Sequence, residues 1–285
     1  MKKSTIGMGL LGLGASAVLG RKQLRKPEKL SDEKTRWLTE KIIAHRGIHN
    51  NGGNAPENTL AAFQKAVEKN YPIELDVRLT RDKKVVVIHD KKLKRLLGYD
   101  EEVQDLNFSD FKDKTILGSD QRVPLFREVL ELVDGKVPIL VEIKSHGAIG
   151  PLEKRLYDLL KHYKGAYAIQ SFNPFSVKWF HDHAGEVVRG QLSGNFQINE
   201  YEKAYQGAEE LPVYQKFLLK NLMFNFLSRP NFIAYEIQDT EHARLIKIQK
   251  LGVPLLGWTV KNRIEYLEVK DLCDNLIVDD VTLVF

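Results

Sequence analysis

Nine short apolar runs alternate with helical patterns from residue 31 onward, and this alternation constrains the fold more than any other feature. The runs lie at 42–44, 73–77, 85–88, 139–143, 167–169, 186–188, 232–235, 255–260 and 276–278. Helical patterns separate most of them, for example at 58–69, 126–133, 152–163, 240–251 and 262–270. Continuous apolar strands that alternate with helices indicate a parallel sheet covered by helices. This number of units predicts an α/β fold, a TIM (β/α)8 barrel, with one of the nine runs outside the barrel.

One junction does not fit the strand–helix repeat. Only the residues RLTRDKK, 78–84, separate the second run from the third, which is too short for an ordinary crossover helix. The chain therefore either returns almost fully extended or pairs the two runs as a hairpin. The segment 91–121, rich in Asp, Lys and Gly, predicts a small insertion after the third strand, either an excursion or a lid.

The composition is that of an ordinary globular protein, with 285 residues, 43% of them hydrophobic and 28% charged. The net charge of +5 arises within residues 1–40, which hold nine Lys/Arg and four Asp/Glu, whereas the remainder holds 34 of each sign. This balance argues against a nucleic-acid partner. The single cysteine, Cys273, provides neither a disulfide nor a zinc ligand set, so we expect it to be buried.

The N-terminal stretch 6–19, IGMGLLGLGASAVL, is uncharged and lies between basic clusters. As a helix it reaches about 21 Å, short of the roughly 30 Å hydrocarbon core of a bilayer. Three interpretations stay open: a membrane anchor with a basic border suited to anionic lipid, a signal cleaved near Ala15–Ala17, and a disordered tail. We divide the chain into this anchor or signal segment, 1–30, and a barrel domain, 31–285. We expect membrane association, with secretion after cleavage as the alternative.

Polar side chains stand within or at the end of several apolar runs: His45 and Arg46, Glu74 and Asp76, His89 and Asp90, Glu142 and Lys144. In barrel enzymes the carboxyl ends of the strands and the following loops form the active face. Each pattern alone is compatible with a turn or a surface ion pair, but their coincidence indicates a site. Three buried carboxylates at one barrel mouth require a cation, and oxygen ligands favour Mg²⁺ or Ca²⁺ over zinc.

Seven short motifs, in chain order HRG, PENT, ELDV, IHD, EIK, QSF and WTV, resemble those of the glycerophosphodiester phosphodiesterase family. The resemblance covers about residues 40–280. It implies a metal-dependent barrel, related to phosphatidylinositol-specific phospholipases, that cleaves glycerophosphodiesters to glycerol 3-phosphate and an alcohol. It further implies that the glycerol 2-hydroxyl attacks first and that water then opens a cyclic phosphate.

The resemblance also implies roles for individual residues. It assigns catalysis to His45 and His89, one divalent cation to Glu74, Asp76 and Glu142, and substrate binding to Arg46, Lys144, Gln170 and Trp258. For Glu57 it leaves open a carboxylate of the metal site, a supporting carboxylate or a substrate contact. A histidine near its ordinary pKa of about 6.5 can act as acid or base, and which of the two does which stays open. The remaining histidines match no motif, and we expect surface or structural roles for His49, His146, His162, His181, His183 and His242.

Two positions depart from the usual family pattern. Lys261 follows WTV where Asn is usual, and the last strand reads IVDD where Ile-Thr-Asp is usual. We expect both departures at the rim, where they affect substrate contacts rather than catalysis. Two other functions stay open: a lysophospholipase D-type hydrolase acting on lysophospholipids, and a catalytically silent barrel that binds phospholipid headgroups. The intact histidines and carboxylates argue against the silent barrel.

Overall fold

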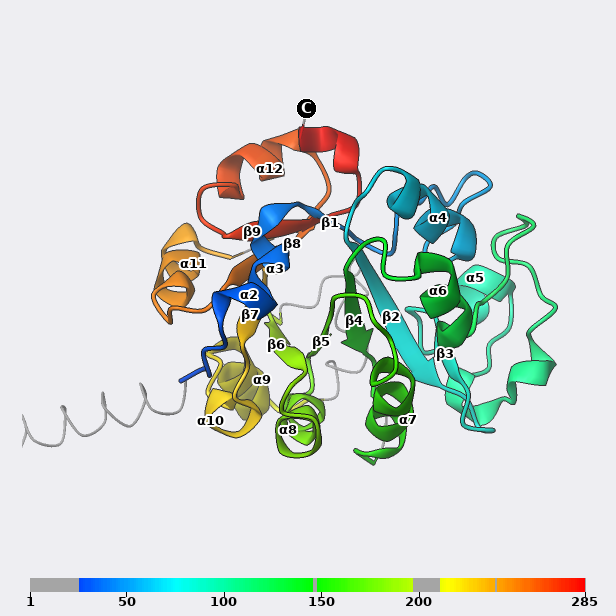
Figure 1. Ribbon diagram of the computed structural model, residues 1–285, viewed down its shortest axis with the longest axis horizontal. Helices are drawn as coiled ribbons and strands as arrows, with labels where there is room; N and C mark the ends of the chain where they lie inside the picture. Colours follow the sequence, from blue (N-terminus) through cyan, green and yellow to red (C-terminus); the bar gives the residue numbers. More distant parts are fainter. Residues whose placement is uncertain (1–25, 146–147, 197–210, 239, 285) are drawn as a thin grey trace, which may run out of the picture.

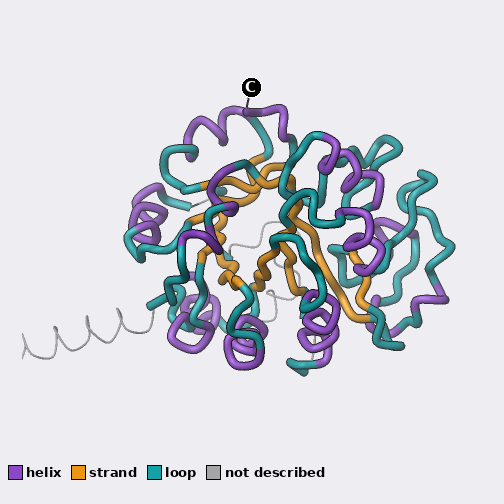
Figure 2. The backbone as a smooth tube through the Cα atoms, in the orientation of Figure 1, coloured by secondary structure: helices purple, strands orange, loops and turns teal. Residues whose placement is uncertain are grey.

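A closed barrel of eight parallel strands, surrounded by helices, forms the centre of the computed structural model (Figures 1 and 2). The structure describes residues 26–145, 148–196, 211–238 and 240–284. Most of the predicted anchor or signal segment, and His146, therefore lie outside the described residues. Among the described residues no helix is long and apolar enough to cross a membrane.

Each of the nine apolar runs overlaps a strand, although the run 186–188 meets its strand only at Val188. The strands are β1 (Ile43–Ala44), β2 (Ile73–Leu79), β3 (Val85–Val87), β4 (Ile139–Ile143), β5 (Tyr167–Ser171), β6 (Val188–Ser193), β7 (Phe232–Glu236), β8 (Leu255–Val260) and β9 (Asn275–Val278). The order is β1-β9-β8-β7-β6-β5-β4-β2, and the pairing of β1 with β2 closes the ring. The predicted TIM-like barrel is thus confirmed, and the strand outside it is β3.

The strand β3 pairs antiparallel with β2, with Val77 opposite Val87 and Leu79 opposite Val85. Of the two conformations left open for residues 78–84, the hairpin is therefore the one observed. The segment that follows β3 lies beside the barrel and holds α5 (Lys94–Leu97), η1 (Val103–Asp105) and η2 (Phe108–Asp110) (Figure 1). It packs around a small apolar cluster with Val86 and Ile88 of the β3 region, so the predicted insertion has a core of its own.

The helices cover the outside of the barrel. They are α2 (Asp32–Thr35), α3 (Trp37–Glu40), α4 (Leu60–Glu68), α6 (Phe126–Val133), α7 (Pro151–Leu160), α8 (Pro174–His183), α9 (Val213–Lys220), α10 (Asn225–Ser228), α11 (His242–Gln249) and α12 (Arg263–Val269), with η4 (Val281–Val284) near the end. In α6 the residues Phe126, Val129, Leu130 and Val133 are buried, the spacing of one helical face. Cys273 is buried under this helical layer, as predicted.

The interior of the barrel is apolar at its amino end and polar at its carboxyl end. Side chains two residues apart on a strand share a face. The apolar layer therefore lies beneath the polar one: Ile43 beneath His45, Leu140 beneath Glu142, Ala168 beneath Gln170, and Leu256 beneath Trp258. Leu38 of α3 packs into the same apolar cluster. Because the apolar layer fills the amino end of the barrel, the candidate site lies at the carboxyl ends of the strands.

Candidate active site

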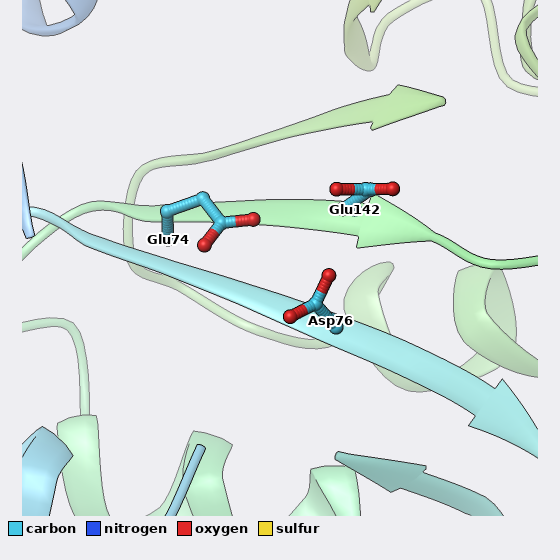
Figure 3. A group of neighbouring side chains, drawn as sticks. All are labelled: Glu74, Asp76 and Glu142. Atoms are coloured by element: carbon cyan, nitrogen blue, oxygen red, sulfur yellow. The ribbon is translucent and has the colours of Figure 1, made fainter. Parts of the chain in front are cut away.

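Three carboxylates converge where β2 and β4 run side by side (Figure 3). Asp76 and Glu142 are paired in the parallel register of these strands, and Glu74 lies two residues before Asp76. One carboxylate oxygen of each residue lies within 4.8 Å of the other two. All three residues are buried, with 1%, 1% and 6% of their surface exposed for Glu74, Asp76 and Glu142. The residues predicted as a metal site are therefore brought together by the fold.

The electrostatics of this cluster show a shortage of positive charge. Burial, with repulsion from Asp76 and Glu142, raises the pKa of Glu74 well above its usual value. Burial and Asp76 also raise the pKa of Glu142, although Lys144 opposes them. Burial acts in the same direction on Asp76, but Lys144, His89 and Arg46 outweigh it and hold its pKa well below the usual range. The raised pKa values show that the nearby cations do not fully neutralise these buried carboxylates. The cluster is therefore suited to bind a hard divalent ion, which prefers oxygen ligands.

Two cations flank the carboxylates. Lys144 Nζ lies 2.6 Å from Glu142 Oε1 and 3.2 Å from Asp76 Oδ1. The Nε atom of Arg46 lies 3.5 Å from Asp76 Oδ2, and the Arg46 backbone N–H donates to Glu74 Oε2 at 3.1 Å. Both side chains line the cavity above the carboxylates, where they can meet an anionic substrate.

The HRG turn needs its glycine. Gly47 has a φ of +81°, and a Cβ there would lie 2.9 Å from the backbone carbon of Ala62 in α4. Only glycine tolerates this conformation and this close approach without strain. The turn aims the Arg46 side chain back toward β2, so the motif follows from packing as well as from chemistry.

Glu57 lies behind Arg46 and is not among the described residues that line the cavity. It accepts from Arg46 NH1 at 2.7 Å, from Arg95 NH1 and NH2 at 2.8 and 2.7 Å, and from Asn51 Nδ2 at 2.8 Å. Although burial acts to raise it, these partners hold the pKa of Glu57 well below its usual range. Of the roles left open for Glu57, support of Arg46 fits the geometry, whereas metal binding and direct substrate contact do not.

His45 pairs with an aspartate from the last strand segment. Its Nδ1 lies 2.5 Å from Asp279 Oδ1, and its Nε2 lies 4.0 Å from Glu74 Oε2. Because an ionised carboxylate only accepts, Asp279 selects the tautomer with the proton on Nδ1 and leaves Nε2 free to exchange a proton. Burial and Arg46 lower the pKa of His45 despite Asp279. The expectation that the IVDD departure concerns only the rim is therefore wrong for Asp279, because β9 lies beside β1 and brings it to His45.

His89 pairs with its own neighbour in the chain. The Nδ1 atom of His89 lies 2.8 Å from Asp90 Oδ1, and Arg95 holds Asp90 from the other side, with Nε donating to Oδ2 at 2.7 Å. Burial, together with Arg46 and Lys144, lowers the pKa of His89 to about 3. His89 is thus a neutral imidazole in the metal-free protein at neutral pH.

Three residues near this site were not assigned from the sequence. Asn58 of PENT donates from Nδ2 to Asp76 Oδ2 at 2.8 Å. Arg78 follows Asp76 on the same face of β2, and its Nε and NH2 donate to the His89 carbonyl at 2.8 and 2.5 Å. Arg95 sits in the basic run KKLKR, which reads as solvent-exposed surface. The spacing of two from Asp76 was a usable signal for Arg78; nothing local identified Arg95.

The cavity at the barrel mouth measures about 40 Å³. Eight of the ten predicted site residues line it: His45, Arg46, Glu74, His89, Glu142, Lys144, Gln170 and Trp258. Asp76 completes the carboxylate cluster in its wall, and Glu57 stands behind. The Trp258 indole packs edge-on against Phe172 of the QSF motif, with ring centroids 5.5 Å apart. Phe172, which follows β5, and Trp258 of β8 therefore give the cavity an aromatic wall.

The other described histidines lie outside this cavity. His49 is half-buried, with Nδ1 3.1 Å from the His45 carbonyl, which suits a structural role. His183 stacks on Trp179 and His181 pairs with Asp182, both on α8. His162 and His242 are exposed.

Comparison with known proteins agrees with these observations. The model of the glycerophosphoryl diester phosphodiesterase family matches residues 45–283. A glycerophosphodiester phosphodiesterase of Caldanaerobacter subterraneus is 31% identical over 252 residues, which cover 84% of this chain and 93% of that protein. Human lysophospholipase D GDPD1 is 34% identical over 174 residues, 56% of this chain and 54% of that protein.

A solved structure with the same fold is an Oleispira antarctica phosphodiesterase in complex with the product sn-glycerol-3-phosphate. It superposes with a TM-score of 0.70 at 20% identity and covers 87% of this chain and 97% of its own. The family match spans the chain from the HRG turn through β9, and with it every motif that builds the site. The chain therefore belongs to the glycerophosphoryl diester phosphodiesterase family and is a phosphoric diester hydrolase.

Proposed function

We propose that this glycerophosphodiester phosphodiesterase releases glycerol 3-phosphate and an alcohol in glycerophospholipid metabolism, using one Mg²⁺ or Ca²⁺ and two histidines. The observation that carries the proposal is the buried carboxylate cluster with a histidine–aspartate pair on either side of it. The family match and the product named for the Oleispira antarctica structure support the same reaction.

Glu74, Asp76 and Glu142 would hold the cation. A bound divalent ion supplies charge for the phosphoryl oxygen and lowers the pKa of a hydroxyl that it contacts. Three carboxylate donors suit Mg²⁺ and Ca²⁺, which prefer oxygen, better than zinc. Asn58 keeps the Asp76 carboxylate oriented by donating to Oδ2.

Arg46 and Lys144 bind the diester. Both are cationic, both line the cavity, and both stand beside the carboxylates rather than opposite them. They can therefore hold the non-bridging oxygens of a phosphate and stabilise the charge that develops there. Glu57 keeps the Arg46 guanidinium in place through the 2.7 Å ion pair.

The two histidines move the protons. One accepts the proton of the attacking glycerol 2-hydroxyl, and the other donates a proton to the oxygen of the leaving alcohol. The anionic diester raises the pKa of a neighbouring imidazole, which favours the protonated form of the acid. In the second step the roles reverse, because water loses a proton as the cyclic phosphate opens and the 2-hydroxyl regains one. Asp279 and Asp90 hold the two rings in the tautomer that leaves Nε2 available.

Lysophospholipids are a second candidate substrate class. The observation in favour is the 34% identity to human lysophospholipase D GDPD1. That match covers 54% of the human protein, whereas the bacterial glycerophosphodiester phosphodiesterase is matched over 93% of its length. Glycerophosphodiesters are therefore the favoured class.

We also propose that residues 1–30 place the barrel domain, 31–285, at a membrane surface. The uncharged stretch 6–19 and its basic flanks support this location, and secretion after cleavage is the alternative. A chain that starts at Ser31 is expected to leave the membrane fraction and to keep its turnover of a water-soluble diester. Loss of turnover in this folded, shortened chain contradicts the proposal.

Release of glycerol 3-phosphate from a panel of glycerophosphodiesters, and of lysophosphatidic acid from lysophospholipids, with and without a chelator, tests the reaction. We expect release from the diesters, abolished by chelator and restored by Mg²⁺ or Ca²⁺. Glu74→Gln, Asp76→Asn and Glu142→Gln should each weaken metal binding in calorimetry, since each removes one negative ligand. Activity that persists in chelator, together with unchanged metal affinity in all three variants, rules out the proposed metal site.

A further inference from the structure

A second and larger cavity, of about 320 Å³, lies next to the active site. Its walls come from three segments: the β2–β3 hairpin with Thr80 and Lys83, the insertion with Val103 and Asp105, and the start of α7 with Pro151 and Leu152. The hairpin and α7 lie on the same side of the barrel (Figure 1). The cavity is therefore built where the insertion meets the barrel.

Lys144 connects the two cavities. It lines both of them, and its Nζ touches the Glu142 and Asp76 carboxylates. The cavity above the carboxylates has a volume of about 40 Å³, whereas one water molecule requires a cavity of roughly 10–15 Å³. A whole glycerophosphodiester does not fit there, so one end of the substrate must extend beyond it. The larger cavity offers the adjacent space.

Basic side chains outnumber acidic ones in the lining of the larger cavity, although Lys144 is paired with Glu142 and Asp76. Arg78, Lys83, Lys91 and Lys144 line it, against the single carboxylate of Asp105 among the described residues. Lys91 is paired with Glu102 at 2.7 Å, so its charge is partly compensated. Arg78 is buried, and its NH1 has no hydrogen-bond partner in the described part of the chain. Burial also lowers the pKa of Arg78 to about 10, which indicates incomplete compensation of this cation.

We propose that this second cavity receives the alcohol part of the diester and that it favours alcohols carrying a negative group, a carboxylate or a phosphate monoester. An excess of cations along the wall attracts such a group and repels a quaternary ammonium. The inference rests on the proposed function, because it names the substrate class of the same active site. It assigns Lys83 and Lys91 to substrate selection, outside the machinery that cleaves the bond.

Four diesters of glycerol 3-phosphate test the inference in the full-length enzyme with its metal. Their alcohols are hydroxypropionate, propanediol monophosphate, neutral propanediol and cationic choline. We expect kcat/KM for the two anionic alcohols to exceed that for choline by about tenfold, with propanediol between them. The faster of the two anionic substrates identifies the group that the cavity prefers. The preference should shrink at high salt, since the cavity is open to solvent.

Single substitutions test which side chains cause the preference for anionic alcohols. Lys83→Gln and Lys91→Gln should each lower the ratio of kcat/KM for hydroxypropionate to that for propanediol by about threefold, as expected for partly exposed charges. Lys84→Gln is the matched control, because Lys84 is the exposed neighbour of Lys83 and does not line this cavity. It should leave the ratio unchanged.

Different results of these assays contradict the proposed function and the proposed selectivity. If none of the four diesters is cleaved, the proposed function fails. If all are cleaved and the anionic alcohols show no advantage, the basic cavity does not select the alcohol and the inference is overturned. An advantage that survives both lysine substitutions, or that Lys84→Gln lowers equally, also overturns it.

Discussion

Two histidine–aspartate pairs stand in one site, but they are built differently. Asp90 is the chain neighbour of His89, and both are buried. Asp279 is 234 positions from His45 in the sequence, and 34% of its side-chain surface is exposed. The first pair is local and enclosed; the second exists only because β9 lies beside β1 where the barrel closes (Figure 1).

The difference extends to the residues behind each pair. Arg95 of the insertion donates to Asp90 and to Glu57, and Glu57 in turn holds Arg46. His89 and Arg46 therefore share one largely buried network. The His45 pair relies on backbone pairing, in which the His45 N–H donates to the Val278 carbonyl at 2.9 Å. Two similar histidine–aspartate pairs can therefore depend on an insertion in one case and on the pairing of the first and last strands in the other.

Removing either imidazole is expected to have the largest effect. His45→Ala and His89→Ala should each lower kcat by about 10² to 10⁴, the usual contribution of general acid–base catalysis. Because the two act as a unit, the double variant should lose much less than the product of the single losses. A near wild-type kcat in either single variant removes that histidine from the mechanism.

The same variants distinguish the roles of the two pairs. A diester with a nitrophenolate leaving group needs no proton on departure, so this substrate should rescue only the variant that lacks the general acid. The measurement is the ratio of kcat on the nitrophenyl diester to kcat on an alkyl diester. An equal ratio for both variants means that neither histidine alone donates to the leaving group.

Substituting the aspartates tests the difference between the pairs. Asp90→Asn and Asp279→Asn should each lower kcat by about 10- to 100-fold, because the ring loses the carboxylate that selects its tautomer. The two variants should differ in their free energy of unfolding. Asp90→Asn leaves Arg95 and His89 with a weaker buried partner and should lower the free energy of unfolding by roughly 1–3 kcal/mol. Asp279→Asn, at a more exposed position, should lower it by less than about 1 kcal/mol. Urea unfolding in the absence of metal provides the measurement, and equal losses contradict the distinction.

Arg95 tests the link between the insertion and the site. Arg95→Met should lower kcat by about tenfold, since one planar guanidinium bridges two carboxylates. Arg95→Lys should recover only part of this loss, because an ammonium lacks the fork that reaches both Asp90 and Glu57. The control is Arg122→Met, whose exposed pair with Asp113 lies elsewhere in the insertion. If Arg122→Met lowers kcat equally, the effect belongs to the insertion as a whole.

The pH dependence of stability should also reflect the burial of His89. The pKa of His89 is lowered to about 3 in the folded protein, against about 6.5 in an unfolded chain. As the pH falls below 6.5 the unfolded chain binds this proton first, so stability is lost progressively between about pH 6.5 and 3. His89→Asn should make this loss shallower in metal-free protein, by at most roughly 1.4 kcal/mol per pH unit. His162→Asn, at an exposed position, should leave the slope as it is.

The sequence predicted the architecture well because barrel strands are buried on both faces. Their apolar runs are continuous, so β4 and β8 match the prediction residue by residue, whereas the run 186–188 overlaps β6 only at Val188 because the polar residues Arg189 and Gln191 interrupt the apolar pattern. The short connection 78–84 limited the β2–β3 junction to two conformations, and only the structure selected the hairpin. For the site, the spacing of two along β2 is enough to predict that Glu74 and Asp76 share one face.

Contacts between distant segments were not predictable in the same way. Asp279 was placed at the rim because the strand containing IVDD shows no sign of its neighbour, and barrel closure alone brings it to His45. Arg95 gave no signal because a basic run on a short helix looks the same whether it faces water or two buried carboxylates. Glu57 was recognised by its motif, but its partners come from two other segments.

Periodicity and short motifs are enough to predict the fold class, the family and the residue types that carry the chemistry. The tertiary structure alone decided which aspartate orients each histidine, which arginine joins the insertion to the site, and where the basic cavity lies beside Lys144. The physical reason is that periodicity records which face of an element is buried, whereas charge pairing depends on distances between elements that the closed barrel sets.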